Sequence, residues 1–205
     1  METRTRRRLG RAERERQILD AAVEVFSERG FQQASMDAVA KLVGVTKPVL
    51  YTHFGSKDGL LLACISRARA ELLQVTTDAV AAATGPEDAL RRGTRAFFDY
   101  LDAQGPAWTV LYSETTAGSD SLEAIRQQQV DFIVGLLTAD CPDVDPLRLE
   151  GWAQIIVGAT ERLALWRAGV GADVVTAEQA TQYLMDLAWT GLERGPAAPG
   201  AQSRG

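Results

Sequence analysis

Two short helical segments separated by a tight glycine turn constrain the fold of this chain more than any other feature of its sequence. Ser35 can cap a first helix that continues to Leu42, and Gly44 can end it, because glycine readily adopts the left-handed conformation that closes a helix. Thr46 can cap a second helix with Pro48 in its first turn, where the missing backbone amide costs nothing. Two helices about four residues apart predict a helix-turn-helix.

The second of these helices has the sequence KPVLYTHF, and Leu50 near its centre is the single residue of this helix that we predict to be buried. Because a small core needs little else from this helix, its outer face is free to enter a groove of DNA. A further helix starts at Lys57, between Ser56 and Asp58, where the lysine would lie beside the phosphates. The residues that we expect to contact DNA are Ser35, Thr46, Lys47, Pro48, Val49, Tyr51, Thr52, His53 and Lys57.

These side chains offer different chemistries to DNA. Lys47 lies at the amino end of the second helix and could donate to a guanine, while Pro48 and Val49 could touch a thymine methyl group. The hydroxyl of Tyr51 can donate to a phosphate oxygen, and packing alone is its alternative role. His53, the single histidine of the chain, could contact a phosphate or pack at the helix end.

We expect no metal site, no cofactor and no catalytic residues. The two cysteines, Cys64 and Cys141, are far apart and have no histidine beside them, which argues against a zinc site and a disulfide framework. The sequence contains no nucleophile with a neighbouring base, no carboxylate pair and no glycine-rich phosphate loop after a predicted strand. These absences argue against an enzyme.

From Arg14 to Leu62 the sequence resembles the tetracycline-repressor (TetR) family of bacterial transcription regulators. The resemblance is carried by QILDAAVEVFSERGF (residues 17–31), ASMDAVAKLVGV (residues 34–45) and KPVLYTHFGSKDGLLL (residues 47–62), which are specific as a set. It implies that Tyr51, His53 and Lys57 contact phosphates, as the matching positions commonly do in that family. Beyond Ala63 the resemblance implies only an all-helical body.

Charge is distributed unevenly along the chain. The net charge is -5, yet residues 1–57 hold 11 Lys and Arg against 7 Asp and Glu, and the remainder holds 11 against 20. An acidic body repels DNA and so helps to orient the basic, DNA-binding part of the protein toward it. The arginines of residues 1–13 could form a flexible arm on DNA or a solvated tail. Because no run of eighteen apolar residues is present, we expect a soluble cytoplasmic protein without a membrane partner.

Helical periodicity continues through the rest of the chain, and no alternating strand pattern competes with it. We therefore predict an all-α fold: a helix-turn-helix module in residues 14–57, a helical effector-binding and dimerisation domain in residues 58–193, and a disordered tail in residues 194–205. A helix of about 27 residues, or about 40 Å, joins the module to the body. Further helices are predicted for residues 14–28, 86–103, 105–116, 119–139, 145–168 and 176–193.

Aromatic residues concentrate in the predicted body, and helical bundles commonly enclose ligand sites. We expect a small apolar or aromatic effector there, bound by Phe97, Trp108, Tyr112, Arg126 and Trp152. Core packing is the alternative role for the aromatic residues, and a solvated face is the alternative for the arginine. A shift at the body end of the connecting helix would move the DNA-reading helix and so couple the two sites.

The last two helices pair with their symmetry mates in the TetR family, and the resemblance implies a homodimer here. Residues with apolar or small surfaces suited to this contact are Gly158, Leu165, Trp166, Tyr183, Leu184, Leu187, Ala188 and Gly191. Completion of the monomer core is their alternative role. Two readers about 34 Å apart match successive turns of the major groove and predict a roughly palindromic operator.

Together these patterns predict a ligand-responsive, dimeric DNA-binding regulator that acts as a repressor and leaves its operator when the effector binds. The alternative is a DNA-binding regulator or architectural protein without a small-molecule effector, which a body packed without a cavity would favour. An activator is a further alternative, because the direction of regulation depends on where the operator lies.

Overall fold

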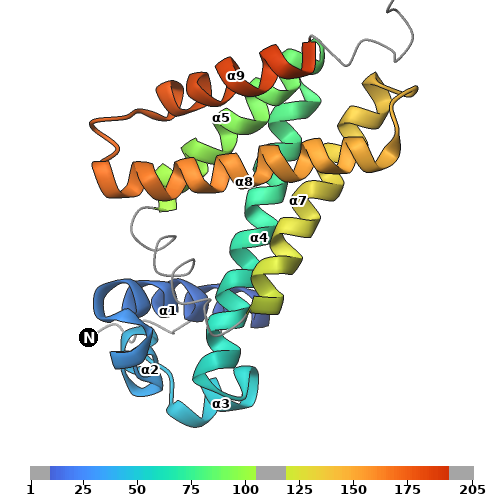
Figure 1. Ribbon diagram of the computed structural model, residues 1–205. Coiled ribbons are helices and arrows are strands. Elements are labelled where there is room, and N and C mark those ends of the chain that lie inside the picture. The colour runs from blue at the N-terminus through green and yellow to red at the C-terminus, as the bar shows by residue number, and fades with distance from the viewer. Residues whose placement is uncertain (1–9, 105–118, 194–205) are drawn as a thin grey trace, which may run out of the picture. The chain divides into compact units, whose positions relative to one another are not determined.

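The computed structural model describes residues 10–104 and 119–193, which form eight α-helices and no strand (Figure 1). The all-α fold predicted from the sequence is therefore confirmed. The helices are α1 (Arg11–Gln33), α2 (Met36–Val43), α3 (Lys47–Phe54), α4 (Lys57–Ala81), α5 (Pro86–Gln104), α7 (Ser119–Asp140), α8 (Pro146–Val170) and α9 (Ala177–Glu193). No helix in the described part of the chain is both long and apolar enough to cross a bilayer.

The chain divides into two compact units, and the division falls inside α4, between Arg69 and Ala70. The first unit contains α1, α2, α3 and the start of α4; the second contains the rest of α4 with α5, α8, α9 and α7 from Asp120 onward. The sequence pattern instead places the boundary after Lys57, where the helix-turn-helix ends. The first turns of α4 belong to the first unit because they bury apolar side chains there, among them Leu60.

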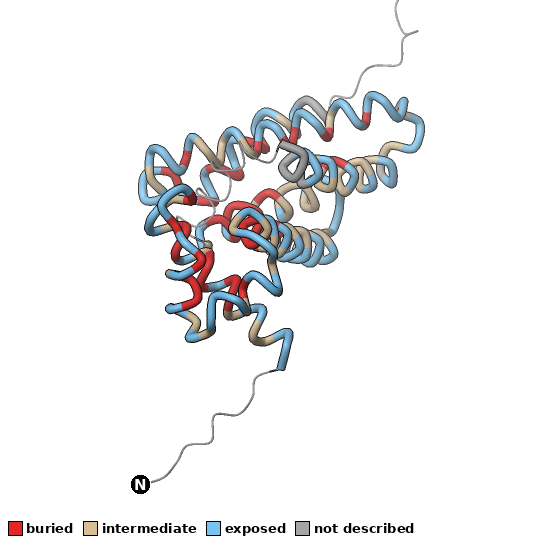
Figure 2. Tube along the Cα trace, turned by 90° about the horizontal axis from the view of Figure 1, so that it is seen from below, coloured by how far each residue is buried: buried red, intermediate tan, exposed pale blue. Residues whose placement is uncertain are grey.

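In the first unit, α1 buries one face along its length. Ile18, Ala22 and Phe26 are almost completely inaccessible to solvent, and the spacing of four residues places them on the same side of the helix. Figure 2 shows buried stretches alternating with exposed ones along the helices. The helix begins at Arg11, earlier than the predicted start at residue 14. Gly30, the predicted stop, has a φ of 70° and breaks the helical path before Gln33.

The helix-turn-helix forms as the sequence predicts. The Ser35 hydroxyl accepts a hydrogen bond from the Ala38 amide at 3.2 Å, and Gly44 ends α2 with a φ of 76°. Thr46 precedes α3 in an extended conformation, but its side chain makes no capping hydrogen bond. The turn between α2 and α3 therefore depends on the glycine and on Pro48 more than on a threonine cap.

A tight junction joins α3 to α4. Gly55 ends α3 with a φ of 72°, and the Ser56 hydroxyl accepts from the Gly59 amide at 2.9 Å, which caps α4. A Cβ atom at Gly59 would collide with the carbonyl oxygen of Phe54, so only glycine allows the two helices to approach this closely. The junction fixes where α3 ends relative to the first turn of α4.

In the second unit, α9 packs against α5 and α8. Phe97 and Phe98 of α5 are buried and meet edge to face, with ring centroids 5.3 Å apart. A second apolar cluster joins α7 to α8 through Val130, Ala153 and Val157. The second unit is therefore a helical bundle with a core of its own.

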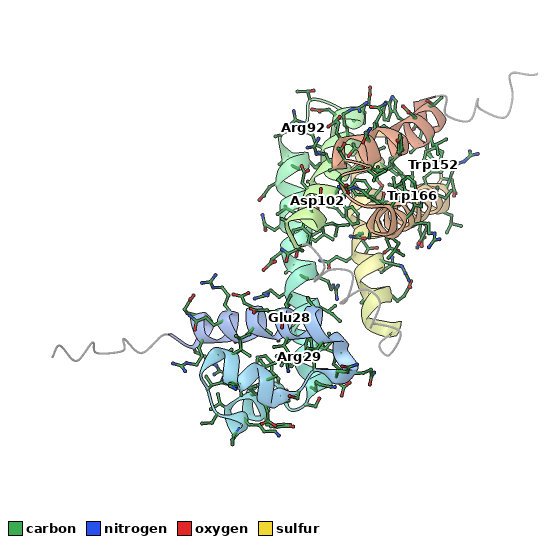
Figure 3. All side chains as sticks on the ribbon, turned by 90° about the vertical axis from the view of Figure 1, so that its left-hand side faces the viewer. Glu28, Arg29, Arg92, Asp102, Trp152 and Trp166 are labelled. Carbon is green, nitrogen blue, oxygen red and sulfur yellow. The ribbon has the colours of Figure 1, made fainter. Side chains whose placement is uncertain are left out.

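A buried arginine ties three parts of this bundle together. Arg167 of α8 is 5% exposed, and its guanidinium donates to both carboxylate oxygens of Asp102, at 2.6 and 2.8 Å. Asp102 lies on α5 (Figure 3). The Arg167 Nε donates to the carbonyl oxygen of Val175, which lies between α8 and α9. Because an unpaired buried charge is strongly unfavourable, this set holds the connection of α8 to α9 against the end of α5.

The predicted helix starts of the second unit are also confirmed. Asp145 caps α8 by accepting from the Arg148 amide at 3.2 Å, and Pro146 follows in the first turn. Thr176 and Gln179 form the predicted capping box, in which each side chain accepts from the other residue's backbone amide, at 2.9 and 3.2 Å. The helix predicted for residues 105–116 lies outside the described residues, as does the tail.

Candidate nucleic-acid interface

The short helix α3 exposes most of its side chains. Leu50 is fully buried, as the sequence predicts, and it anchors α3 to the first unit. The remaining candidates on or beside this helix lie at the surface, with only Val49 half-buried; they are Thr46, Lys47, Pro48, Val49, Tyr51, Thr52 and His53. A helix held by one central residue, with polar and small side chains around it, can enter a major groove without unfolding.

The amino end of α2 provides a second contact point. Ser35 is exposed at this end, and its oxygen accepts from the Ala38 amide, which leaves the hydroxyl proton able to donate to a phosphate oxygen. The positive end of the helix dipole adds to the attraction for an anion. Asp37 lies in the same first turn and adds a negative charge there.

That carboxylate forms an ion pair across the helix-turn-helix. Lys47 Nζ donates to Asp37 Oδ2 at 2.8 Å, and both side chains remain largely exposed, at 45% and 67%. The hydrogen bond to Asp37 and the charge of its carboxylate raise the pKa of Lys47 above its usual value. Sequence reasoning identified Lys47 but missed Asp37, because ten residues separate the partners and only the fold brings them together.

The hydroxyl groups on α3 differ in their availability. Tyr51 is 44% exposed, and so its phenol can reach a phosphate oxygen. The Thr52 hydroxyl donates to the carbonyl oxygen of Pro48, one turn earlier, at 2.9 Å, and its proton is already used within the helix. His53 is exposed near the end of α3, and its ring lies 6.0 Å from that of Phe54.

Lys57 has a different environment from the one expected of a phosphate ligand. Its ammonium donates to the carbonyl oxygens of Phe31, Gln32 and Ala34, at 2.8, 3.3 and 3.2 Å. It also lies 4.4 Å from the centroid of the Phe31 ring, within range of a cation–π interaction. All three ammonium donors have acceptors in the chain itself, so Lys57 connects the first turn of α4 to the end of α1.

The residues expected to bind an effector are spread over several helices. Phe97 is buried on α5. Trp152 lies half-buried on α8 (Figure 3), and the guanidinium carbon of Arg148 is 5.9 Å from the centroid of its ring. Arg126 of α7 donates to the Glu161 carboxylate on α8 at 2.8 Å. Trp108 and Tyr112 lie outside the described residues.

The last two helices expose a set of large apolar side chains. Trp166, Tyr183 and Leu187 are 45%, 43% and 82% exposed, whereas Leu184 is 5% exposed and lies in the protomer's own core. Of the other residues expected at a dimer contact, Gly158 is exposed, Leu165 and Ala188 are half-buried, and Gly191 belongs to α9. Sequence reasoning missed Ile155 of α8, which is 68% exposed and eleven residues before Trp166, about three helical turns along the same face.

Two family models match this chain, one over each part. The model described as bacterial regulatory proteins, tetR family, matches residues 18–64, and the one described as tetracyclin repressor-like, C-terminal domain, matches residues 86–191. The first match includes the helix-turn-helix and the start of α4, and the second includes more than half of the chain.

Curated relatives are transcription regulators. The chain is 35% identical over 136 residues to the HTH-type transcriptional activator FasR of Mycolicibacterium smegmatis, which corresponds to 66% of this chain and 58% of FasR. It is 28% identical over 172 residues to the HTH-type transcriptional regulator BetI of Rhizobium meliloti, covering 80% of this chain and 84% of BetI.

Solved structures share the fold. A TetR-like transcriptional regulator from Rhodococcus sp. RHA1 superposes with a TM-score of 0.73 at 36% identity, covering 91% of this chain and 99% of that chain. FadR from Bacillus subtilis, solved in complex with stearoyl-CoA, gives a TM-score of 0.71 at 19% identity over 84% and 96% of the two chains, a likeness of fold alone. The exposed helix-turn-helix and these matches along most of the chain show that the protein belongs to the TetR family of bacterial transcription regulators.

Proposed function

We propose that this protein is a cytoplasmic, dimeric repressor that binds a palindromic operator and leaves it when a small apolar or aromatic molecule binds the helical bundle. The observation that carries the DNA-binding part is the orientation of α3: Leu50 is fully buried while Lys47 and Tyr51 are exposed. This arrangement gives the helix an anchored inner face and an outer face that can read a groove.

Contacts to DNA divide into two kinds. Lys47, Pro48 and Val49 lie at the amino end of α3, the part of a recognition helix that approaches base edges, and they specify sequence. The Ser35 and Tyr51 hydroxyls and the His53 ring contact phosphates, which sets the position of α3 on the duplex. Lys57 supports this surface from inside the first unit, because its ammonium is bonded to three carbonyl oxygens.

Exposed apolar side chains on α8 and α9 support dimerisation. Ile155, Trp166 and Leu187 would each leave a large apolar surface in water in a monomer, and pairing with a second copy would bury it. Tyr183 lies one helical turn from Leu187 and extends the same face. Two copies related by a twofold axis present two α3 helices, and this symmetry requires a palindromic operator.

The helical bundle is the part of the chain that we assign to the effector. Phe97, Trp152 and Arg126 belong to it, and FadR, which shares this fold, was solved in complex with stearoyl-CoA. Helix α4 is continuous from Lys57 to Ala81, across the division between the two units. An effector that binds one arrangement of α4 better than another would therefore change the affinity for DNA.

Two alternatives differ from this proposal in specific ways. A regulator without an effector would keep the same DNA affinity in the presence of any small apolar ligand. An activator would bind the same kind of operator, and the relative FasR is named as one. The direction of regulation follows from the position of the operator relative to the promoter, which a reporter fusion measures directly.

The test is fluorescence anisotropy with duplexes obtained by selection from a random library, together with sedimentation of the complex. We expect two protomers per palindromic duplex, strong salt dependence and binding much tighter than to a scrambled duplex of the same composition. Acyl and aromatic compounds are then screened for release of the DNA. Equal affinity for selected and scrambled duplexes would contradict the proposal.

A further inference from the structure

We propose that Asp37 determines how well this protein distinguishes its operator from other DNA, by holding the Lys47 ammonium at the amino end of α3. The proposal rests on the DNA-binding function proposed above. The observation behind it is the ion pair between Asp37 Oδ2 and Lys47 Nζ at 2.8 Å, which links the first turn of α2 to the first residue of α3.

Lys47 is the only lysine or arginine in the α3 sequence KPVLYTHF. An ammonium carries three donors on a flexible stem, and without a fixed partner it can follow the nearest phosphate. The bond to Asp37 occupies one donor and leaves two for a base edge. Asp37 therefore restricts where the lysine points while leaving it able to donate to a guanine.

Asp37 also acts against binding to DNA of the wrong sequence. Its side chain is 67% exposed and lies two residues after Ser35, at the helix end that would otherwise attract a phosphate. Non-specific binding consists almost wholly of attraction between basic side chains and phosphates. A carboxylate that repels phosphates and occupies the lysine weakens this attraction, whereas on the operator the base contact of Lys47 offsets that effect.

Removal of the Asp37 carboxylate should therefore change the affinity for the operator and the affinity for a scrambled duplex by different amounts. On a scrambled duplex, Asp37→Asn removes the repulsion and frees Lys47 to reach a phosphate. On the operator, the same change removes the repulsion, but it also removes the hydrogen bond that orients the Lys47 ammonium toward a base edge. The affinity ratio between the two duplexes is therefore the quantity that Asp37 controls.

The experiment measures anisotropy of full-length wild type and Asp37→Asn with a duplex selected by the wild type and with a scrambled duplex, over a salt series. We expect about a fivefold gain in affinity for the scrambled duplex, a salt slope steeper by about 0.9, and less than a twofold change on the selected duplex. The matched control is Asp58→Asn, which removes an exposed carboxylate from the first turn of α4 and should leave the affinity ratio unchanged.

A double-mutant cycle with Lys47→Met shows whether Asp37 acts through the lysine. In the Lys47→Met background, we expect Asp37→Asn to change the affinity ratio less than twofold. An unchanged ratio in the single variant, an equal change in Asp58→Asn, or a full effect without Lys47 would each overturn the proposal while leaving the DNA-binding function intact. If the wild type binds its selected duplex no more tightly than the scrambled duplex, both the role of Asp37 and the proposed DNA-binding function are overturned.

Discussion

The Lys57 ammonium lies 2.8 Å from the carbonyl oxygen of Phe31 and 4.4 Å from the centroid of the same residue's ring. Two further carbonyl oxygens, those of Gln32 and Ala34, complete its hydrogen bonds. These carbonyls belong to the segment between Gly30 and Ser35, just before α2. The start of α4 thus determines where the amino end of α2 lies.

Replacement of Lys57 by methionine should lower the free energy of unfolding by about 1–3 kcal/mol, because three carbonyl oxygens lose a charged donor. We expect the salt slope of DNA binding to stay unchanged, since the ammonium is already bonded to three carbonyl oxygens of the chain itself. Urea unfolding and anisotropy over a salt series measure the two quantities. Lys57→Arg is the control that keeps the charge; if Lys57→Met reduces the slope by about one while Lys57→Arg does not, Lys57 contacts a phosphate after all.

Tyr51→Phe should weaken binding to every duplex by a similar factor, about three- to tenfold, because we assign the lost hydroxyl to a phosphate and not to a base. The measurement compares the selected duplex with single-base variants of it. A changed base preference would show instead that Tyr51 reads the sequence.

Lys47→Ala should relax the preference at one base pair in each half-site, at a cost of about 1–3 kcal/mol on the preferred sequence. Repeated selection from a random library with the variant measures the base preference. Since the Lys47 ammonium is already paired with the Asp37 carboxylate in the free protein, the loss of salt dependence should be small. An unaltered consensus sequence would rule out a base contact by this residue.

Leu187→Lys should shift the protein from dimer to monomer, because it places a charge at a side chain that is 82% exposed on α9 and that we assign to the dimer contact. Sedimentation velocity over a concentration series measures the shift. Leu62→Lys is the matched control, because Leu62 is an exposed leucine of the first unit, and it should leave the dimer intact. Equal sedimentation of both variants and the wild type would place the dimer contact elsewhere.

Cys64 should make stability fall at alkaline pH. Burial raises the pKa of its thiol to about 12 from the ordinary value of 9.0, so between these values the folded chain binds more protons than the unfolded chain. The free energy of unfolding then decreases with pH by up to about 1.4 kcal/mol per unit from this group. Urea unfolding from about pH 8 to about pH 11 should show a steeper decrease for the wild type than for Cys64→Ala. Parallel curves would contradict the shift.

Local sequence signals were sufficient for most helix boundaries, since the interactions that set them join residues three or four apart. The Ser35 hydroxyl binds the Ala38 amide, and Thr176 pairs with Gln179 in its capping box. Glycine at position 44 adopts the left-handed conformation that the sequence predicts for the end of α2. The exposed face of α3 could be predicted for a similar reason, because only Leu50 in the middle of that helix is suited to the core.

The contacts that determine what each candidate side chain can do needed the tertiary structure. Lys57 reaches Phe31 across 26 residues, and Arg167 reaches Asp102 across 65, separations for which sequence periodicity carries no information. Leu184 and Leu187 look alike in the sequence, yet one is buried in the bundle and the other is exposed. Local sequence patterns were thus enough to predict most helices and the family. Packing sets which apolar face is buried and which charges meet, because both depend on how distant helices lie against one another.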